Sequence, residues 1–578
     1  MHTAHIRRRE PVARPDLHPH PVLARVFAAR GIEAPAELDA RLAALQPPAA
    51  LGGLAAATEL LARALAEDWR ILLVGDYDAD GATSTALAVH ALRAMGSASV
   101  DYLVPNRFEY GYGLTPEIVA VAAGRDPQLI VTVDNGIASV EGVAAARAAG
   151  IRVLVTDHHL PGRALPAADA IVNPNAPGCD FPSKALAGVG VIFYVLSALR
   201  ARLREAGWFA ARGLAEPNMA DYLDLVALGT VADVVPLDRN NRVLVEQGLR
   251  RLRAGRARPG IAALFEVGRR APSRAVASDL GFAIGPRLNA AGRLDDMSLG
   301  IECLLAERID SARSMAAELD ALNRERREIE TGMRAEAMAA VAQLIAQLDG
   351  AVPAALCVHR ADWHQGVIGI VAGRVKEALH RPVIAFAPSS EEGAGEGQLK
   401  GSARSIPGLH IRDVLDALAT RHPGLVTRFG GHAMAAGLSL SAARLDEFRD
   451  AFVTEVEAAL GGAPPDRELL SDGELDESEL TLELAGLLKF AAPWGQQFAE
   501  PCFDGVFEVL SRRIVGETHL KLSLRPVGGR GAIDAIAFGW AERDPGAVRL
   551  RAVYKLDVNE WRGEQRLQLL IEHLELAE

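Results

Sequence analysis

The chain has 578 residues, of which 49% are hydrophobic and 24% are charged. At about 100–200 residues per domain this length predicts several domains, and the ordinary composition excludes a mainly disordered, collagenous or coiled-coil protein. The formal net charge of −12 has the wrong sign for a protein that coats nucleic acid over its whole surface. Positive charge is local, since residues 242–274 hold nine arginines against two glutamates. This segment fits a phosphate-binding face and a solvated helix surface equally well.

Features of exported or membrane-spanning chains are missing from the sequence. The longest near-apolar stretch, residues 185–199, is shorter than the roughly 20 residues that span a bilayer, and it predicts a buried helix. The arginine- and proline-rich start lacks the apolar segment of a secretory signal. The four cysteines have no short pair spacing, which excludes a disulfide framework and a zinc ribbon. We expect a protein of the cytoplasm without membrane contact.

The predicted elements begin with a helical lead-in over residues 1–60 that carries few motifs. From about residue 65, short β-rich runs alternate with Ala-rich helical stretches, and the runs are 71–75, 100–104, 129–133 and 153–156. This alternation predicts a parallel sheet with helices on both faces. Ligands of such sheets gather beyond the carboxyl ends of the strands.

The second half of the chain predicts three further parts. Residues 310–347 carry apolar side chains at helical intervals and predict a long connecting helix. A second α/β region follows at 351–460, and residues 461–465 (Gly-Gly-Ala-Pro-Pro) have the composition of a linker. Five short alternating runs, typical of a small barrel or sandwich, then occur at 507–510, 520–524, 532–538, 550–558 and 565–571.

Acidic and imidazole side chains follow three of the predicted strands. They are Asp76, Asp78 and Asp80 after the first strand, Asp134 after the third, and Asp157, His158 and His159 after the fourth. The first group resembles a calcium loop, but an EF-hand needs a helix before the loop and Glu at its twelfth position. Here a strand precedes the loop and Leu87 holds the twelfth position, so the EF-hand reading fails.

A solvated turn would also explain one acidic loop, but it does not explain several at one edge. Like charges that converge at the ends of parallel strands repel one another and resist ionisation. A divalent ion removes that cost, and oxygen ligands with one or two imidazoles suit Mn²⁺ or Mg²⁺. Asp233 lies in a further apolar stretch and is expected either to cap a helix or to join the same cluster.

These motifs together resemble the DHH phosphoesterase superfamily. The shared pattern is Asp78-x-Asp80-Gly, Asp134-Asn-Gly, Asp157-His158-His159 and Val231-Ala-Asp233. Residues 430–437 (Gly-Gly-His-Ala-Met-Ala-Ala-Gly) are similar to the glycine-rich motif of the DHHA1 domain that usually follows it. Length, the linking helix and the β-rich end narrow the resemblance to the RecJ family, over roughly residues 50–578.

The resemblance implies a multidomain α/β architecture. The expected parts are a lead-in (1–60), a parallel-sheet DHH catalytic domain (61–309), a connecting helix (310–350), a substrate-binding domain of the DHHA1 type (351–460) and an OB-like β-barrel (466–578). It also implies a single-strand-specific 5′→3′ DNA exonuclease that releases 5′-mononucleotides in DNA repair and recombination. The expected partners are single-stranded DNA and, from the family alone, a single-strand-binding protein and a helicase.

The resemblance assigns roles to the acidic cluster. Asp134 is expected to bridge two Mn²⁺ or Mg²⁺ ions, Asp78 to hold one of them, and Asp80, His158 and Asp233 to hold the other. Asp76 and Asp157 are expected to lie next to these ligands without binding a metal themselves, and His159 is expected to face the scissile phosphate. Two such ions generate a hydroxide near neutral pH and stabilise both oxygens of an in-line displacement.

Substrate contacts are expected at glycine-, arginine- and aromatic-containing segments. Guanidinium groups suit bidentate phosphate capture, glycines let the backbone approach phosphates, and an aromatic ring can stack on a base. The candidates are Arg107, Tyr112, Arg287, Asn289, Arg293, His364, Ser402, Arg404, Gly431 and His432. Core packing of the tyrosine, surface arginines on a turn and a structural histidine remain alternatives.

Two alternative functions stay open at this point. One is another phosphodiesterase of the superfamily, acting on short oligonucleotides or cyclic dinucleotides. The other is a DHH scaffold without activity that only binds nucleic acid. The first would lack the β-rich end, and the second would lack metal ligands that this sequence retains.

Overall fold

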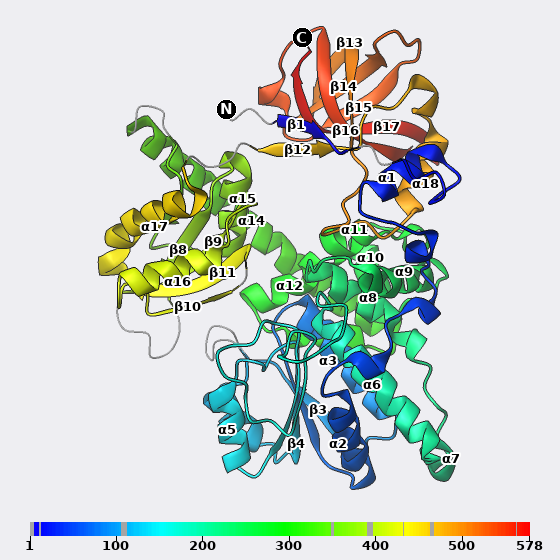
Figure 1. Cartoon of the computed structure of the whole chain (residues 1–578), viewed down its shortest axis with the longest axis vertical. Helices are drawn as coiled ribbons and strands as arrows, with labels where there is room; N and C mark the ends of the chain where they lie inside the picture. Colours follow the sequence, from blue (N-terminus) through cyan, green and yellow to red (C-terminus); the bar gives the residue numbers. More distant parts are fainter. Residues whose placement is uncertain are drawn as a thin grey trace.

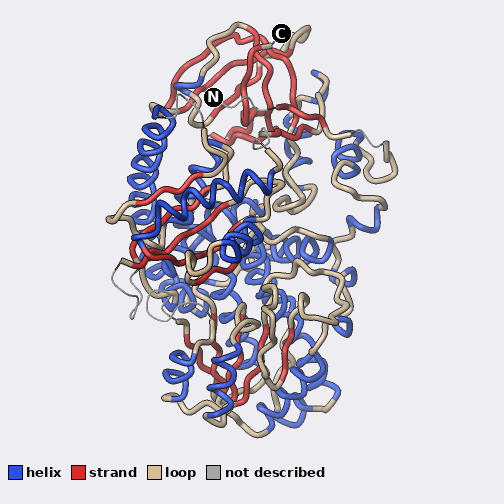
Figure 2. The backbone as a smooth tube through the Cα atoms, turned by 60° about the vertical axis from the view of Figure 1, so that its left-hand side comes forward, coloured by secondary structure: helices blue, strands red, loops and turns tan. Residues whose placement is uncertain are grey.

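The computed structural model describes residues 5–10, 13–105, 113–347, 352–389, 397–431, 433–462, 467–561 and 563–577. Figure 1 shows a large body with the parallel sheet at one end, a second α/β body beside it, and a β-barrel at the opposite end. Figure 2 shows the same separation of barrel and first sheet from another direction. The 39-residue helix α14 (Ile309–Gln347) connects the first body to the second and agrees with the predicted connecting helix.

The first sheet is parallel throughout, as the alternating pattern predicts, with strand order β3-β2-β4-β5-β6. Its strands are β2 (Ile71–Gly75), β3 (Val100–Leu103), β4 (Leu129–Val133), β5 (Arg152–Thr156) and β6 (Ala170–Val172). The apolar runs of β2 and β4 are buried because both faces are covered. Leu73 packs on one side, in the core with helices α2 (Leu54–Ala66), α3 (Ala79–Ala94) and α6 (Gly188–Glu205). Leu72 packs on the other, with α4 (Pro116–Ala123) and α5 (Val140–Ala148).

A helical layer completes the first body and positions one acidic residue. Helix α8 (Leu223–Ala232) packs against α3 and α9 (Arg239–Arg253), and it ends at Asp233. The other helices of this layer are α7 (Trp208–Arg212), α10 (Pro259–Val267), α11 (Ala277–Asp279), α12 (Gly285–Leu294) and α13 (Ser298–Leu305). One turn of π-helix, Leu280–Ile284, joins α11 to α12.

The second body has a mixed sheet in the order β10-β11-β9-β8-β7. Strands β7 and β8 pair in parallel, and the other neighbours pair antiparallel. The strands are β7 (Leu356–His359), β8 (Val383–Pro388), β9 (Gln398–Arg404), β10 (Arg428–Gly431) and β11 (Ala435–Ser441). The helices are α15 (Ile368–Leu379), α16 (Ile411–Arg421) and α17 (Leu445–Leu460). The predicted linker at 461–465 lies partly outside the described residues.

The C-terminal strands form a closed ring in the order β13-β14-β15-β17-β16. They are β13 (Phe503–Val515), β14 (His519–Pro526), β15 (Ile533–Ala537), β16 (Arg549–Trp561) and β17 (Glu564–Leu576). Leu520, Leu522 and Leu524 alternate into its core, which explains the period of two in the sequence. Helix α18 (Leu482–Phe490) packs against β16 and β17.

The prediction of a helical lead-in over residues 1–60 is wrong for much of that segment. Strand β1 (His5–Arg8) pairs in parallel with β12 (Glu468–Ser471), which lies far away in the sequence. Helix α1 (Pro21–Ala28) is followed by three short 3₁₀ turns, and its Phe27 stacks on Trp494. In the part of the chain that the structure describes, no single helix meets the length and hydropathy of a membrane span, although one bent pair, Leu42–Ala50 with Leu54–Ala66, does so jointly.

Candidate active site

The acidic loops meet at the carboxyl edge of the parallel sheet. The ends of β2, β4 and β5 are level, because Gly75 pairs with Val133 and Val133 pairs with Thr156. The residues that come next are Asp76, Asp134 and Asp157. Parallel register alone therefore brings three carboxylates, distant in sequence, to one rim.

Ligand atoms of the cluster fall into three overlapping groups, each within 4.8 Å. The groups are Asp76 with Asp78 and Asp134, Asp80 with His158 and Asp233, and Asp134 with His158 and His159. Asp134 and His158 each belong to two of these groups, so neighbouring groups share side chains. The geometry also adds Asp76 to the candidate ligands, although the sequence interpretation puts it behind them.

The imidazole of His158 faces two carboxylates of the cluster. Its Nε2 atom lies 3.1 Å from Asp134 Oδ1 and 3.5 Å from Asp233 Oδ2, and this buried atom makes no hydrogen bond. Burial, and then the charge of His159, lower the pKa of His158, so the ring is neutral near pH 7. A buried neutral imidazole among carboxylates is the donor set that a divalent ion completes.

The carboxylates of the cluster are costly to ionise without a metal. Burial, followed by repulsion from Asp233, raises the pKa of Asp80 to about 7. Burial and then Asp78 raise the pKa of Asp233 to about 7 as well. For Asp134, burial and the neighbouring carboxylates raise the pKa well above its ordinary range. Divalent cations relieve this repulsion, so the residues present fit a pair of hard metal ions.

Asp157 and His159 form a separate pair at the same rim. Asp157 Oδ1 accepts hydrogen bonds from the backbone N–H of His158 and His159 and lies 2.7 Å from His159 Nδ1, while Oδ2 accepts from Ile137 N–H at 2.9 Å. Burial opposes protonation of His159, but the contact with Asp157 outweighs it and raises the pKa to about 9. The raised pKa therefore favours a protonated His159 near neutral pH, and both oxygens of the Asp157 carboxylate that holds it already accept hydrogen bonds.

The start of helix α6 supports the cluster, a feature that the sequence interpretation missed. The backbone N–H groups of Gly188 and Val189 donate to the two oxygens of Asp80 at 2.7 and 2.9 Å. A Cβ atom at Gly188 would lie 2.6 Å from both Cβ and Oδ1 of Asp134, and one at Gly229 would lie 2.8 Å from Asp80 Oδ1. Glycine is required at both positions because the backbone comes into contact with metal-ligand candidates.

Two residues of the rim have left-handed backbones. Asp134 has φ 63° and Val234, which follows Asp233, has φ 62°. Aspartate tolerates this conformation, but a β-branched residue does so only at a cost of about 1–3 kcal/mol. The surrounding structure therefore imposes these conformations beside two candidate ligands.

Two of the predicted substrate contacts in α12, Arg287 and Asn289, mainly connect elements of the fold. The guanidinium of Arg287 pairs with Asp320 of α14 at 2.8 Å and donates to two backbone carbonyls, which commits it to packing rather than to a phosphate. Asn289 Oδ1 accepts from Ala79 N–H at 2.8 Å and so supports the loop that carries Asp78. Neither arrangement favours the phosphate contact expected from the sequence.

Arg293 and His364 lie where the two α/β bodies meet. Arg293 donates from Nη1 to the carbonyl of Gly366 at 3.1 Å, and His364 Nδ1 accepts from Gly366 N–H at 3.1 Å. A Cβ atom on Gly366 would clash with the Arg293 carbonyl at 2.3 Å. Both predicted residues are thus brought to the junction of the two bodies.

Ser402 and Arg404 of β9 come together at the start of α15. Arg404 Nη1 donates to Ser402 Oγ at 3.1 Å, and a Cβ atom on Gly369, near the N-terminus of α15, would meet Arg404 Nη2 at 2.7 Å. Burial lowers the pKa of Arg404, and among the described residues no carboxylate pairs with it. A guanidinium, a hydroxyl and a helix N-terminus are donors that suit an anion.

Other predicted contacts are less informative. Gly431 ends β10 at φ 142°, and a side chain there would clash with the Ala435 carbonyl at 2.5 Å. Arg107, Tyr112 and His432 lie outside the described residues.

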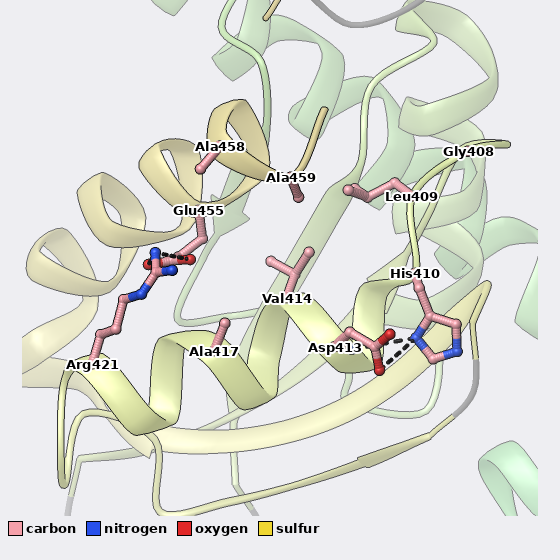
Figure 3. Close-up of a pocket in the computed structure, with 10 residues that line it drawn as sticks. All are labelled: Gly408, Leu409, His410, Asp413, Val414, Ala417, Arg421, Glu455, Ala458 and Ala459. Atoms are coloured by element: carbon pink, nitrogen blue, oxygen red, sulfur yellow. Dashed lines mark hydrogen bonds and ion pairs between the residues drawn. The ribbon is translucent and has the colours of Figure 1, made fainter. Parts of the chain in front are cut away.

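A cavity in the second body is not part of this site. It has a volume of about 350 Å³ between α16 and α17 (Figure 3). Its charged side chains already pair with each other, Arg421 with Glu455 at 2.7 Å and His410 with Asp413 at 3.1 Å. This leaves no uncompensated charge in the cavity to attract a ligand.

Comparisons with known proteins match the three bodies. Residues 70–230 match the DHH family, N-terminal domain, residues 341–458 match the DHHA1 domain, and residues 471–573 match the RecJ OB domain. The chain is 58% identical over 575 residues to the single-stranded-DNA-specific exonuclease RecJ of Dickeya dadantii, with 98% of each chain covered.

Solved structures agree with these matches. The structure of Thermus thermophilus RecJ in complex with Mn²⁺ superposes with a TM-score of 0.78 at 31% identity and covers 99% of this chain and 79% of that one. The complex of the same protein with Mg²⁺ has a TM-score of 0.74 at 30% identity, with 99% and 78% covered. With this identity over almost the whole length and the full DHH ligand set at one sheet edge, the chain belongs to the RecJ family of the DHH superfamily.

Proposed function

We propose that this protein is an exonuclease that degrades single-stranded DNA from its 5′ end and releases 5′-mononucleotides. The observation that carries the proposal is the meeting of Asp134, His158 and Asp233 beside the cationic His159. The similarity to RecJ exonucleases over the whole length supports the same activity and the same class of substrate. The expected role is in DNA repair and recombination.

The rim is suited to two Mn²⁺ or Mg²⁺ ions, the metals named for the related structures. Asp134 would be shared, Asp78 and Asp76 would hold one ion, and Asp80, His158 and Asp233 would hold the other. Bound there, the ions would lower the pKa of water and stabilise the attacking and leaving oxygens of a phosphodiester.

The protein's own groups would bind and orient the phosphate. The raised pKa of His159 favours a protonated ring, which would stabilise negative charge that develops on the scissile phosphate. Asp157 fixes the orientation of the ring and keeps it protonated. Gly188 and Val189 hold Asp80 through both carboxylate oxygens, which leaves its orientation little freedom.

The second body would hold the strand next to the metals. Arg404, Ser402 and the N-terminus of α15 offer an anion site for a strand phosphate, and Arg293 and His364 lie at the junction of the two bodies. The proposed substrate is a single strand, in agreement with the single-strand-specific exonucleases that the chain resembles. Arg107, Tyr112, Gly431 and His432 remain proposed contacts with the substrate.

The cellular location, the partner proteins and the roles of the domains are part of the same proposal. The chain would act in the cytoplasm, with a single-strand-binding protein and a helicase as partners. The functional division would follow residues 61–309 for catalysis, 310–350 for the connection, 351–460 for strand binding and 466–578 for an OB-like domain.

Digestion of end-labelled DNA tests this function. With Mn²⁺, a 5′-labelled single strand should release labelled mononucleotide first, while a blunt duplex should resist. Asp134→Ala should abolish cleavage and keep strand binding, whereas Asp450→Ala, at an exposed site in the second body, should behave as wild type. Release of internal or 3′-terminal fragments first, or turnover by Asp134→Ala, would contradict the proposal.

A further inference from the structure

A second and larger cavity lies in the first body, at the end of α3 opposite to the metal cluster. It has a volume of about 710 Å³. Its walls come from the last turn of α3, the segment before α8, the end of α9 with the loop that follows, and the end of α13. Helix α3 has 16 residues, so about 24 Å of helix separates this cavity from Asp78.

Positive charge dominates the lining. Arg93, Arg251, Arg256 and Arg258 line the cavity, and the last three belong to the arginine-rich segment whose role the sequence leaves open. They come from separate elements, so the fold gathers them into one concave surface.

Two of these arginines are already used by the protein. Arg258 lies with Nε 3.3 Å from Oδ1 of the buried Asp224, and Arg251 pairs with Asp221 at 2.8 Å. Arg258 also lies over the ring of Tyr222, 4.8 Å from its centre. These contacts fix the floor of the cavity and satisfy its inner charges.

The other two arginines are not used. Arg93 and Arg256 are exposed, and within the described ranges neither forms an ion pair or a side-chain hydrogen bond. The only carboxylates that line the cavity are Asp221, which is paired, and Glu307. The cavity therefore has an excess of positive charge at its mouth.

A histidine in the wall adds no positive charge to the cavity. Burial, followed by repulsion from Arg258, lowers the pKa of His90 to about 4. The ring is thus neutral near pH 7.

We propose that this cavity binds a mononucleotide, with its phosphate held between Arg93 and Arg256. Guanidinium groups bind a phosphate monoester through charge-assisted, paired hydrogen bonds. Ala94, Pro217 and Leu305 give the cavity an apolar wall for a base, and Asn218 adds an amide beside it. The volume lies within the range of about 300–1,000 Å³ that is usual for small-ligand sites.

This site is separate from the place where the proposed reaction forms its product. A nucleotide bound at the metal cluster depends on divalent ions, but one bound by Arg93 and Arg256 does not. A chelator therefore excludes binding at the metal cluster, and the Arg93/Arg256 variant distinguishes this cavity from the anion site at Arg404. Failure of nucleotide binding here leaves the proposed exonuclease function intact.

Equilibrium dialysis of the full-length protein with labelled deoxyadenosine 5′-monophosphate in EDTA tests the proposal. The wild type should bind one nucleotide per chain, and Arg93→Ala with Arg256→Ala should weaken binding about tenfold or more. Arg334→Ala with Arg543→Ala removes two other exposed arginines as a matched control and should leave binding unchanged. Deoxyadenosine, which lacks the phosphate, should not bind.

Three results would overturn the proposal. One is the absence of nucleotide binding by the folded wild type at millimolar ligand, and another is equal binding by the Arg93/Arg256 variant. The third is a loss of single-strand binding in that variant with nucleotide binding unchanged, which would assign the arginines to DNA. Melting curves check folding, and charge reversal at both positions should eliminate binding if the alanine variant retains part of it.

Discussion

Replacement of Gly188 by alanine tests whether the start of α6 positions the bridging carboxylate. The added Cβ would lie 2.6 Å from Cβ and Oδ1 of Asp134, whereas carbon contacts are ordinarily about 3.5–4.0 Å. Either Asp134 or the helix must therefore move by about 1 Å. The same helix end donates to Asp80, so a shift of the helix would displace that ligand too.

The size of the effect follows from these distances. Overpacking of this kind costs about 1–3 kcal/mol, but alanine is favoured over glycine in a helix by about 1 kcal/mol. We therefore expect a loss of about 0–2 kcal/mol in stability. Misplacement of a catalytic group by about 1 Å costs roughly 100-fold in rate. Activity should thus fall far more than stability does.

The assay measures single-turnover release of the 5′ nucleotide together with Mn²⁺ titration and thermal melting. Gly190→Ala is the matched control, because its Cβ would press on the Leu186 side chain at 2.6 Å rather than on a metal-ligand candidate. That variant should lose stability but keep most of its rate. If Gly188→Ala keeps full rate and metal affinity, or if both variants lose rate equally, the positioning role is refuted.

Three further predictions follow from the site. The pKa values of Asp80 and Asp233 are raised from 3.8 to about 7, so the metal-free fold loses stability as the pH rises from about 4 to 7 and regains none above it. Protons compete with metal for the same carboxylates below pH 7. The increase in melting temperature on adding Mn²⁺ should therefore be larger at pH 8 than at pH 6, and an equal increase would refute the coupling. His159→Asn should lower the single-turnover rate by about 100–1,000-fold while Mn²⁺ affinity changes little; a parallel loss of metal affinity would instead make His159 a ligand. Arg404→Lys keeps the charge but loses the paired donors, so KM for a 5′-phosphorylated strand should rise about tenfold at constant melting temperature, and an unchanged KM would exclude a phosphate contact.

The sequence alone was sufficient for the parallel sheet and for most of its acidic rim. The run Ile71–Gly75 is apolar throughout because both faces of β2 are covered. A continuous apolar run of this kind can be recognised directly in the sequence. Parallel strands have their carboxyl ends at one edge, so Asp134 and Asp157 could be placed together without coordinates. The period of two in residues such as Leu520 and Leu522 likewise indicated a β-rich end.

What the sequence could not decide depends on contacts between distant segments. Whether Arg287 binds a phosphate or Asp320 is determined by the approach of α12 to α14, and no local pattern encodes that approach. The pairing of β1 with β12 is equally invisible, because a short strand in an N-terminal segment has no partner signal of its own. No sequence motif surrounds Gly188. A side chain is excluded at this position only because α6 packs against Asp134. Periodicity and strand order are local or topological properties that a sequence carries directly, whereas close approach and charge pairing exist only in the packed tertiary structure.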